Sequence, residues 1–177
     1  MPKGGTPISG ECSRANGDQP PAQNPLDHAK LLASRGQLAL GRELCEGILR
    51  RDPLDAEAYF LLAGIYQEMG DAAQAERALQ RCIYLTPDAA LPHFVLGTLL
   101  LRERKLWRAR RCFETVAHLL RQMPDDTALP DGDGLTAGHL AGLARTALAM
   151  VTTTTRRSVR PRPAAFEDSR QGGARMR

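Results

Sequence analysis

Apolar residues within 56–88 recur at helical spacing in two blocks separated by Gly70. In the first block, Tyr59, Leu62 and Tyr66 fall three or four residues apart, so they are expected to share one face of a helix. Glycine ends helices readily, and Gly70 therefore predicts a turn between the blocks. The inner face of the second block is predicted to carry Ala75, Leu79 and Cys82.

Polar residues stand where the predicted helices begin. Their side chains can accept a hydrogen bond from a free backbone N–H in the first turn. The predicted helices are Leu26–Arg35, Gln37–Arg51, a pair within 56–88, Ala90–Glu103, Leu106–Gln122 and a last helix after Thr136. The predicted caps are Asn24, Asp55, Asp71 and Thr136.

The same pattern returns when the sequence is shifted by about 34 residues. Forwards, the inner-face positions become His93, Leu96, Gly97, Leu100, Ala109 and Phe113. Backwards, the helix-ending Gly70 and Pro87 become Gly36 and Pro53. The inner-face positions Ala63, Tyr66, Leu79 and Cys82 become Ala29, Leu32, Cys45 and Ile48. The sequence therefore predicts three tandem helix pairs.

This spacing of large and small residues resembles the tetratricopeptide repeat, whose unit is about 34 residues long. The resemblance implies an all-α fold, an α-solenoid of about three antiparallel helix-turn-helix repeats. A last helix carries a continuous apolar stripe, which predicts that it caps the open end of the third repeat. Alternatively, this helix binds a helix of a partner. The stripe consists of Leu140, Leu143, Ala144, Ala147, Leu148 and Val151.

Charge and composition divide the chain into three parts. We expect a disordered leader at 1–24, a repeat domain at 25–151 and a disordered, arginine-rich tail at 152–177. The repeat region 25–150 holds fifteen basic and sixteen acidic residues, whereas 151–177 holds seven arginines against Glu167 and Asp168. The net charge of +4 therefore comes from the tail.

No stretch is apolar enough for a membrane span, and the N-terminus has no signal-peptide core. These features predict a cytoplasmic protein. The cysteines Cys12, Cys45, Cys82 and Cys112 form no C-x-x-C pair, and we expect them to act as small buried hydrophobic residues.

In proteins with tetratricopeptide repeats, ligands usually lie in a groove formed by the first helix of each repeat. By resemblance, the groove-facing positions include Leu26, Ala33, Gly64 and Leu91. An aromatic residue off the core stripe makes a good binding anchor, although Phe60 and Phe94 could instead pack against a neighbouring helix. The residues predicted to contact a protein partner are Lys30, Glu57, Phe60, Gln67, Glu68, Phe94, Thr98, Leu101 and Arg102.

A basic cluster surrounds the turn of the third repeat. It could attract an acidic partner, or it could be an ordinary solvated surface. Trp107 is expected to pack at this turn. The clamp of basic residues and asparagines that some repeat proteins use for a terminal carboxylate is not expected, because only Lys30 and Arg102 lie among the groove positions. The cluster consists of Arg102, Arg104, Lys105, Arg108, Arg110 and Arg111.

Catalytic motifs are missing from the sequence. The four histidines show no metal-ligand spacing, and there is no nucleophile elbow, phosphate loop or dinucleotide fingerprint. We therefore expect no enzyme activity, no cofactor, no bound metal and no small-molecule substrate.

Three segments are similar to the helical-repeat extension of bacterial chemotaxis methyltransferases, which methylate glutamates of chemoreceptors. They are DPLDAEAYFLLAGIYQ at 52–67, YLTPDAALPHFVLG at 84–97 and LPDGDGLTAG at 129–138. The α/β catalytic domain that those enzymes need does not precede this region, so no cofactor-binding residue can be transferred.

The resemblance implies a non-enzymatic scaffold or adaptor in chemosensory signalling. Its partner would be a chemoreceptor, a methyltransferase or a signalling scaffold. One alternative is a regulatory repeat fragment of a methyltransferase. Another is a nucleic-acid or membrane-surface binder that uses its basic tail, although nucleic acid is not the expected partner because no aromatic residues interleave the arginines.

Overall fold

The computed structural model of the chain describes residues 24–130, 132 and 134–158, with side chains described up to residue 153. The predicted leader, apart from its last residue, and residues 159–177 of the predicted tail lie outside this part. The helices are α1 (Pro25–Ser34), α2 (Leu38–Arg51), α3 (Ala56–Glu68), α4 (Ala72–Leu85), α5 (Ala90–Arg102), α6 (Leu106–Leu119), the short 3-10 helix η1 (Leu120–Gln122) and α7 (Ala137–Ser158).

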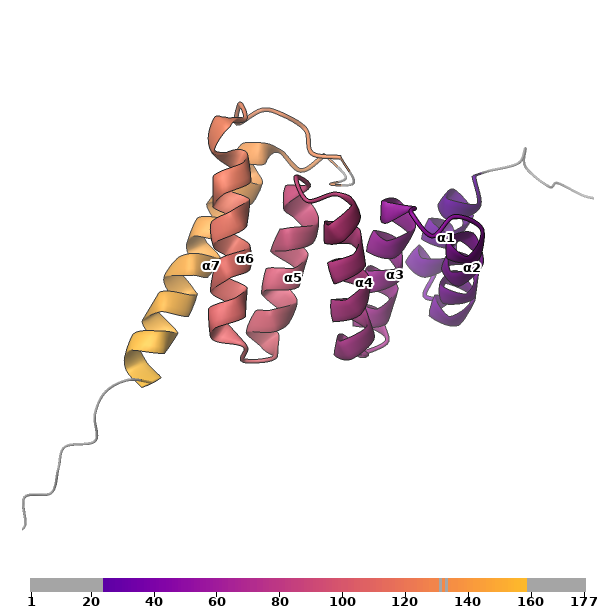
Figure 1. Cartoon of the computed structure of the whole chain (residues 1–177), viewed down its shortest axis with the longest axis horizontal. Helices are drawn as coiled ribbons and strands as arrows, with labels where there is room; N and C mark the ends of the chain where they lie inside the picture. Colours follow the sequence, from indigo (N-terminus) through magenta and orange to yellow (C-terminus); the bar gives the residue numbers. More distant parts are fainter. Residues whose placement is uncertain (1–23, 131, 133, 159–177) are drawn as a thin grey trace, which may run out of the picture.

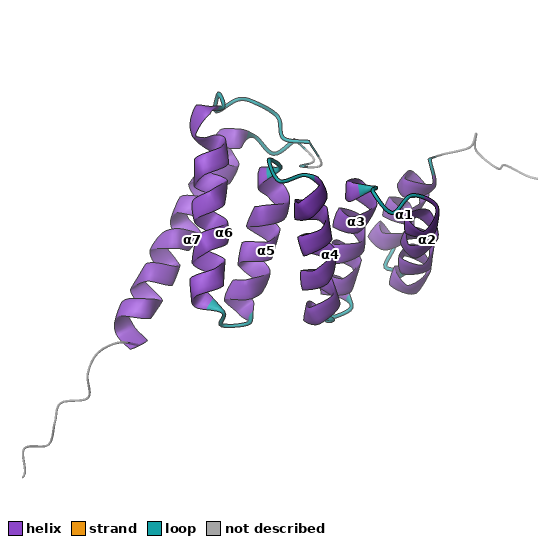
Figure 2. Cartoon of the chain, viewed as in Figure 1, coloured by secondary structure: helices purple, strands orange, loops and turns teal. Residues whose placement is uncertain are grey.

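The helices stand side by side in a row that follows the chain from α1 to α7 (Figure 1). Helices α1 and α2, α3 and α4, and α5 and α6 each pack as a pair, and α7 packs on α6. Helices make up nearly all the regular structure of the described residues (Figure 2). Apart from an isolated β-bridge between Ala128 and Thr136, none of the described residues is in a β-strand. The predicted all-α fold of three stacked helix pairs with a further helix is confirmed.

The predicted helix caps are present. Asp55 Oδ1 accepts a hydrogen bond from the Ala58 N–H at 2.8 Å, and Asp71 Oδ1 accepts one from the Gln74 N–H at 3.0 Å. Each bond satisfies a backbone donor that has no partner inside the helix. Asn24 and Thr136 cap α1 and α7 in the same way. These local bonds explain why the starts of the helices could be predicted to within about one residue.

Three clusters of buried side chains run along the row. The first cluster lies around α1, α2 and α3 and contains Cys45 and Leu62. Tyr66 packs against this cluster and also against the next one along the row, the central cluster, which contains Leu79 and Phe113. The central cluster joins the second and third helix pairs, and a further cluster joins α5 and α6 to α7 and the segment before it. The core is therefore continuous between repeats, as expected when no repeat can bury its apolar face alone.

One polar residue interrupts the predicted inner face. His93 occupies the position of Tyr59 one repeat later, and it is half-buried. Its Nε2–H donates a hydrogen bond to the Pro87 carbonyl oxygen at 3.0 Å. A polar side chain is tolerated here because its hydrogen-bonding group has a partner.

Helix α7 covers the end of the third repeat, as the capping hypothesis predicted. Leu140, Ala144 and Val151 are at most 1% exposed. They pack against α5 and α6, so this face of α7 already has its partner within the chain. Leu143 departs from the predicted stripe, because it remains 40% exposed.

The boundary predicted between repeat domain and tail lies too early. Helix α7 continues to Ser158, whereas the sequence suggested that the structured part ends at residue 151. The hydroxyls of Thr152 and Thr153 both donate to the Ala149 carbonyl oxygen, at 2.9 and 2.8 Å. These bonds satisfy the hydroxyls within the helix, and packing of the buried Val151 outweighs the weak helix propensity of the threonines that follow it.

The segment between η1 and α7, residues 123–136, is called the connector. The Ala137 N–H donates to the Thr127 carbonyl oxygen at 2.9 Å, and the Leu129 N–H donates to the Leu135 carbonyl oxygen at 2.9 Å. Leu129 is 8% exposed and belongs to the cluster beneath α7. The hydrogen bonds thus fix the shape of the connector and join it to the start of α7, while the buried Leu129 side chain holds it against the third repeat.

The cysteines of the described part lie within or beside the core. Cys45 and Cys82 are buried and Cys112 is half-buried, in agreement with their predicted packing role. Cys12 lies outside the described residues. None of the described helices is both long enough and apolar enough to cross a membrane.

Candidate functional site

A cleft of about 560 Å³ opens between α1, α3 and the middle of α5. We call it the groove cleft. The first helices of the three repeats contribute most of its walls, which is the surface that the sequence predicted for ligand binding. It is lined by Lys30, Ala33, Ser34, Leu38, Glu57, Phe60, Leu61, Gly64, Ile65, Gln67, Glu68 and Val95.

Five of the nine predicted contact residues line this cleft. Lys30 comes from α1, and the ion pair between its ammonium and the Glu57 carboxylate bridges α1 and α3. Phe60, Gln67 and Glu68 follow along α3. Both members of the ion pair are more than 40% exposed, so water screens their attraction, and the pair can open for a ligand at little cost.

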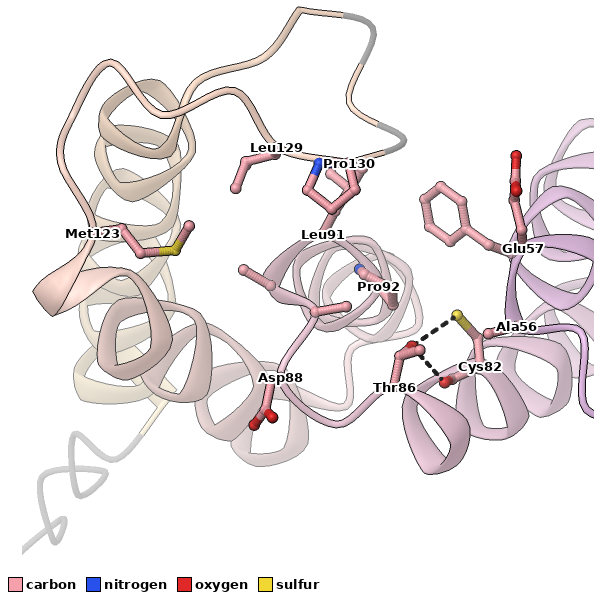
Figure 3. Close-up of a pocket in the computed structure, with 13 residues that line it drawn as sticks. Ala56, Glu57, Cys82, Thr86, Asp88, Leu91, Pro92, Met123, Leu129 and Pro130 are labelled. Carbon is pink, nitrogen blue, oxygen red and sulfur yellow. Dashed lines mark hydrogen bonds between the residues drawn. The ribbon is translucent and has the colours of Figure 1, made fainter.

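A second hollow of about 300 Å³ lies beneath the connector. We call it the connector pocket. Figure 3 shows Leu129 and Pro130 of the connector across from Leu91 and Pro92 of α5, with α3 and α4 on the other side. The lining residues are Ala56, Glu57, Phe60, Cys82, Thr86, Asp88, Ala89, Ala90, Leu91, Pro92, Met123, Leu129 and Pro130.

Glu57 and Phe60 line both hollows, so the groove cleft and the connector pocket meet at the start of α3. The ring of Phe60 is half-buried, with one side packed against the central cluster. An aromatic ring that is anchored in this way loses little side-chain entropy when a ligand covers its remaining surface. The geometry therefore supports the predicted anchor role of Phe60.

Phe94 occupies the equivalent position one repeat later but packs differently. Its ring tilts at 60° against the ring of Phe113, with centroids 5.7 Å apart, and it lines neither hollow. The cause lies in two core positions, where the second repeat has Ala63 and Leu79 and the third has Gly97 and Phe113. The larger Phe113 ring reaches Phe94, which therefore serves mainly as a core residue.

The remaining predicted contacts also lie outside both hollows. Thr98 Oγ1 donates to the Val95 carbonyl oxygen at 2.8 Å, and Leu101 packs against the central cluster. Arg102 is exposed at the end of α5. Contact of these residues and of Phe94 with a partner stays a prediction.

Some lining residues were not predicted. Leu61 and Val95 stand one repeat apart and both line the groove cleft. Their shared apolar character directly beside Phe60 and Phe94 was a signal that could have found them. The connector residues Met123, Leu129 and Pro130 gave no such signal, because their place over α5 depends on how the connector folds.

Acidic groups outnumber basic groups along the two hollows. The carboxylates are those of Glu57, Glu68 and Asp88, and the one cationic side chain in either lining is Lys30. Most of the other lining residues are apolar. The combined surface therefore suits an apolar segment that also carries a positive charge.

The described residues offer little for covalent or metal chemistry. No group of three or more histidine, cysteine, aspartate or glutamate side chains among them could hold a metal ion. Burial, together with the nearby carboxylates of Asp55 and Glu46, raises the pKa of the Cys45 thiol to about 11. Burial likewise raises the pKa of Cys112. These thiols are therefore protonated at neutral pH and poor nucleophiles.

The tetratricopeptide repeat family matches residues 32–93, from within the first helix to the start of the third repeat. No curated protein sequence matches the chain. The groove cleft lies almost entirely within the matched segment.

Several solved structures have a similar fold. The type III secretion chaperone SycD of Yersinia enterocolitica, in complex with a peptide of the translocator YopD, is 14% identical. That match covers 74% of this chain and 92% of SycD, with a TM-score of 0.64. PcrH of Pseudomonas aeruginosa, in complex with the chaperone binding region of PopD, is 17% identical over 74% of this chain and 90% of PcrH, with a TM-score of 0.64.

The tetratricopeptide-repeat domain of P58(IPK) is 25% identical, with a TM-score of 0.62. That match covers 76% of this chain and 33% of the other. None of these matches is a chemotaxis methyltransferase. The chain is therefore an all-α protein with a tetratricopeptide-repeat-like helical fold, in which residues 32–93 match the repeat family directly.

Proposed function

We propose that this chain is a non-enzymatic interaction scaffold that binds a peptide or helix of a protein partner along the groove cleft and the connector pocket. The observation that carries the proposal is the position of Phe60, a half-buried aromatic ring at the junction of two largely apolar hollows. Clustered apolar surface of this kind is typical of a protein-binding site.

The charges of the site narrow the chemistry of the partner segment. Glu57 and Asp88 border the connector pocket without a cation in its lining, and Glu68 borders the groove cleft. We expect the bound segment to combine apolar side chains with at least one lysine or arginine. Its cation would compete with Lys30 for Glu57.

Proteins of similar fold support a peptide ligand. SycD binds a peptide of YopD, and PcrH binds the chaperone binding region of PopD. Their low sequence identity means that this support extends to the type of ligand and leaves open which protein this chain binds.

Selection of a random peptide library on the full chain tests the proposal. Peptides enriched on the wild type should combine apolar and basic residues, and Phe60→Ala should weaken the best of them by about tenfold or more. Tyr84→Ala is the matched control, because Tyr84 is an aromatic residue that is 79% exposed and lies on α4, outside both hollows. This control should bind like the wild type.

Two outcomes would contradict the proposal. One is the failure of the folded wild-type chain to enrich any peptide above background. The other is unchanged affinity in a Phe60→Ala variant whose circular dichroism matches that of the wild type.

The chemosensory setting is the finer part of the proposal. It rests on the three segments similar to the repeat extension of chemotaxis methyltransferases. A regulatory fragment of such an enzyme is the alternative, and an adjoining reading frame for an α/β methyltransferase would favour it. Co-purification with a chemoreceptor or its methyltransferase would support the adaptor role.

A further inference from the structure

The third repeat departs from the others at the turn between its two helices. In the first two repeats this turn is made by Gly36 and Gly70, with φ angles of 74° and 79°. The equivalent residue of the third repeat is Arg104, with a φ angle of 60°. Glycine adopts this left-handed conformation without strain, whereas a residue with a Cβ atom does so at a cost.

A side chain kept at a strained position calls for a reason beyond the turn itself. Arg104 is exposed, and its side chain takes part in no ion pair found among the described residues. The fold would therefore accept glycine at this position. Its exposed guanidinium can therefore contact a group outside the chain.

The neighbours of Arg104 on α6 extend the same surface. Trp107, Arg108 and Arg111 follow at helical spacing on α6, and Arg104 lies in the turn directly before this helix. Trp107 is 67% exposed, which corrects the expectation that it packs at the turn. An exposed indole between guanidinium groups is an unusual solvated surface and a typical interface feature.

Helix α4 contributes to this surface through an ion-pair network. Glu76 accepts from Lys105 Nζ at 2.8 Å and pairs with Arg108 Nη2 at 2.7 Å. The two contacts hold α4 against the turn and neutralise part of the charge. Arg77, on the next position of α4, lines a polar cleft of about 320 Å³ together with Lys105 and Glu76.

We propose that Arg77, Arg104, Trp107, Arg108 and Arg111 form a second binding surface, the basic outer surface, which takes an aspartate- or glutamate-rich segment of a protein partner. The surface lies on α4 and α6, whereas the groove cleft is lined by α1, α2, α3 and α5. Both surfaces can therefore be occupied at once.

An acidic protein segment fits this surface better than a nucleic acid does. Glu76 and Glu103 both line the polar cleft, so a continuous polyanion would meet carboxylates as well as cations. A peptide can place its acidic side chains between them and leave apolar atoms against the indole of Trp107. The modest net positive charge suits such spaced carboxylates.

The test uses the one tryptophan of the chain, Trp107, as an intrinsic probe of the surface. A short peptide of alternating glutamate and serine is titrated into the full chain while the tryptophan emission is recorded. We expect a saturable change in emission that weakens severalfold when the salt concentration rises from about 50 to about 200 mM. Phe60→Ala should leave this response unchanged, so failure of this proposal and failure of the groove proposal are distinguishable.

Arg104→Gly separates binding from folding. This variant removes the guanidinium and relieves the backbone, so its affinity for the peptide should fall about two- to fivefold while its melting temperature rises. Arg111→Gln should lose affinity by a similar factor. Arg121→Gln is the matched control, because Arg121 is an exposed arginine on η1, at the opposite end of α6 from the turn, and it should bind like the wild type.

Three outcomes would overturn the proposal. The first is the absence of a saturable change in Trp107 emission. The second is a set of equal affinities for Arg104→Gly, Arg111→Gln and Arg121→Gln. The third is a change in Trp107 emission when a single-stranded oligonucleotide is added but no change when the acidic peptide is added. This result would assign the surface to nucleic acid. A lowered melting temperature for Arg104→Gly would remove the argument from backbone strain.

Discussion

Gly97 shows how one small residue changes the role of another. A Cβ atom at this position would lie 2.7 Å from Cε1 of Phe113. The missing side chain lets the Phe113 ring approach α5 closely at Gly97 and contact Phe94. The second repeat has Ala63 in this place and a leucine instead of the phenylalanine, which leaves Phe60 beside the groove cleft.

We therefore predict that Gly97→Ala destabilises the chain by about 1–3 kcal/mol, because the added methyl group overpacks a fully buried ring. Gly64→Ala is the matched control, since nothing lies within 4 Å of its added Cβ atom. The control should be neutral or more stable by up to about 1 kcal/mol, because alanine favours the helix. Urea unfolding measures both values, and equal effects would contradict this account of the core.

Glu76 is the carboxylate with the clearest electrostatic role. Burial alone raises the pKa of Glu76. The hydrogen bonds from Lys105 and Arg108 and the positive charges of these residues lower this pKa by more than burial raises it, so the net shift is downward. The folded state therefore binds the proton less well than the unfolded chain does. This contribution to stability is present above the unfolded pKa and is lost as the pH falls through the lower, folded pKa.

From this sign we predict that Glu76→Gln lowers the free energy of unfolding by roughly 1 kcal/mol at neutral pH. Below the folded pKa of Glu76 the difference from the wild type should disappear. Urea unfolding at a series of pH values down to the acid range measures it. A constant difference across the series would show that the loss comes from packing and has no electrostatic origin.

At the scale of whole elements, α7 completes the fold. Leu140 is fully buried against the third repeat, whereas Leu143, one turn further along the same helix, is 40% exposed. The two leucines therefore separate the docked face of α7 from its outer face.

Leu140→Ala should destabilise the chain by roughly 2–4 kcal/mol, since it leaves a cavity in the cluster beneath α7. The control Leu143→Ala should cost less than about 1 kcal/mol. The comparison is made by chemical unfolding followed by circular dichroism. A cost for Leu143→Ala as large as that for Leu140→Ala would mean that α7 is docked in another orientation.

The helices could be predicted closely because their signals are local. Apolar periodicity, the caps at Asp55 and Asp71 and the turn glycines each depend on a few neighbouring residues. The 34-residue shift then extended these signals from one repeat to the next. The end of α7 was placed too early because the threonines were read by their weak helix propensity, whereas packing of Val151 into the core favours a helix that continues past it.

The candidate site was predictable only where it belongs to the repeat. Lys30, Glu57, Phe60, Gln67 and Glu68 were placed in the groove by register, and they line it. Register did not foresee that Phe94 packs on Phe113 and lines neither hollow, and its contact with a partner stays a prediction. The repeat register also gave no information on the connector pocket, because the connector residues that cover it lie outside the repeats.

At the scale of the whole molecule, the stacked helix pairs give the chain two different surfaces. The first helices of the repeats and the connector enclose the apolar, acidic hollows that meet at Phe60. The second helices of the last two repeats carry the basic outer surface. A scaffold of this form could hold two segments of opposite charge on one small domain.

The central claim is that a partner segment lies along the hollows that meet at Phe60. Backbone hydrogen exchange of the full chain, with and without a peptide selected on it, tests this claim most directly. The account predicts that bound peptide slows exchange in α1, α3 and the first turns of α5. Slower exchange in α4 and α6, with α1 and α3 unchanged, would contradict it.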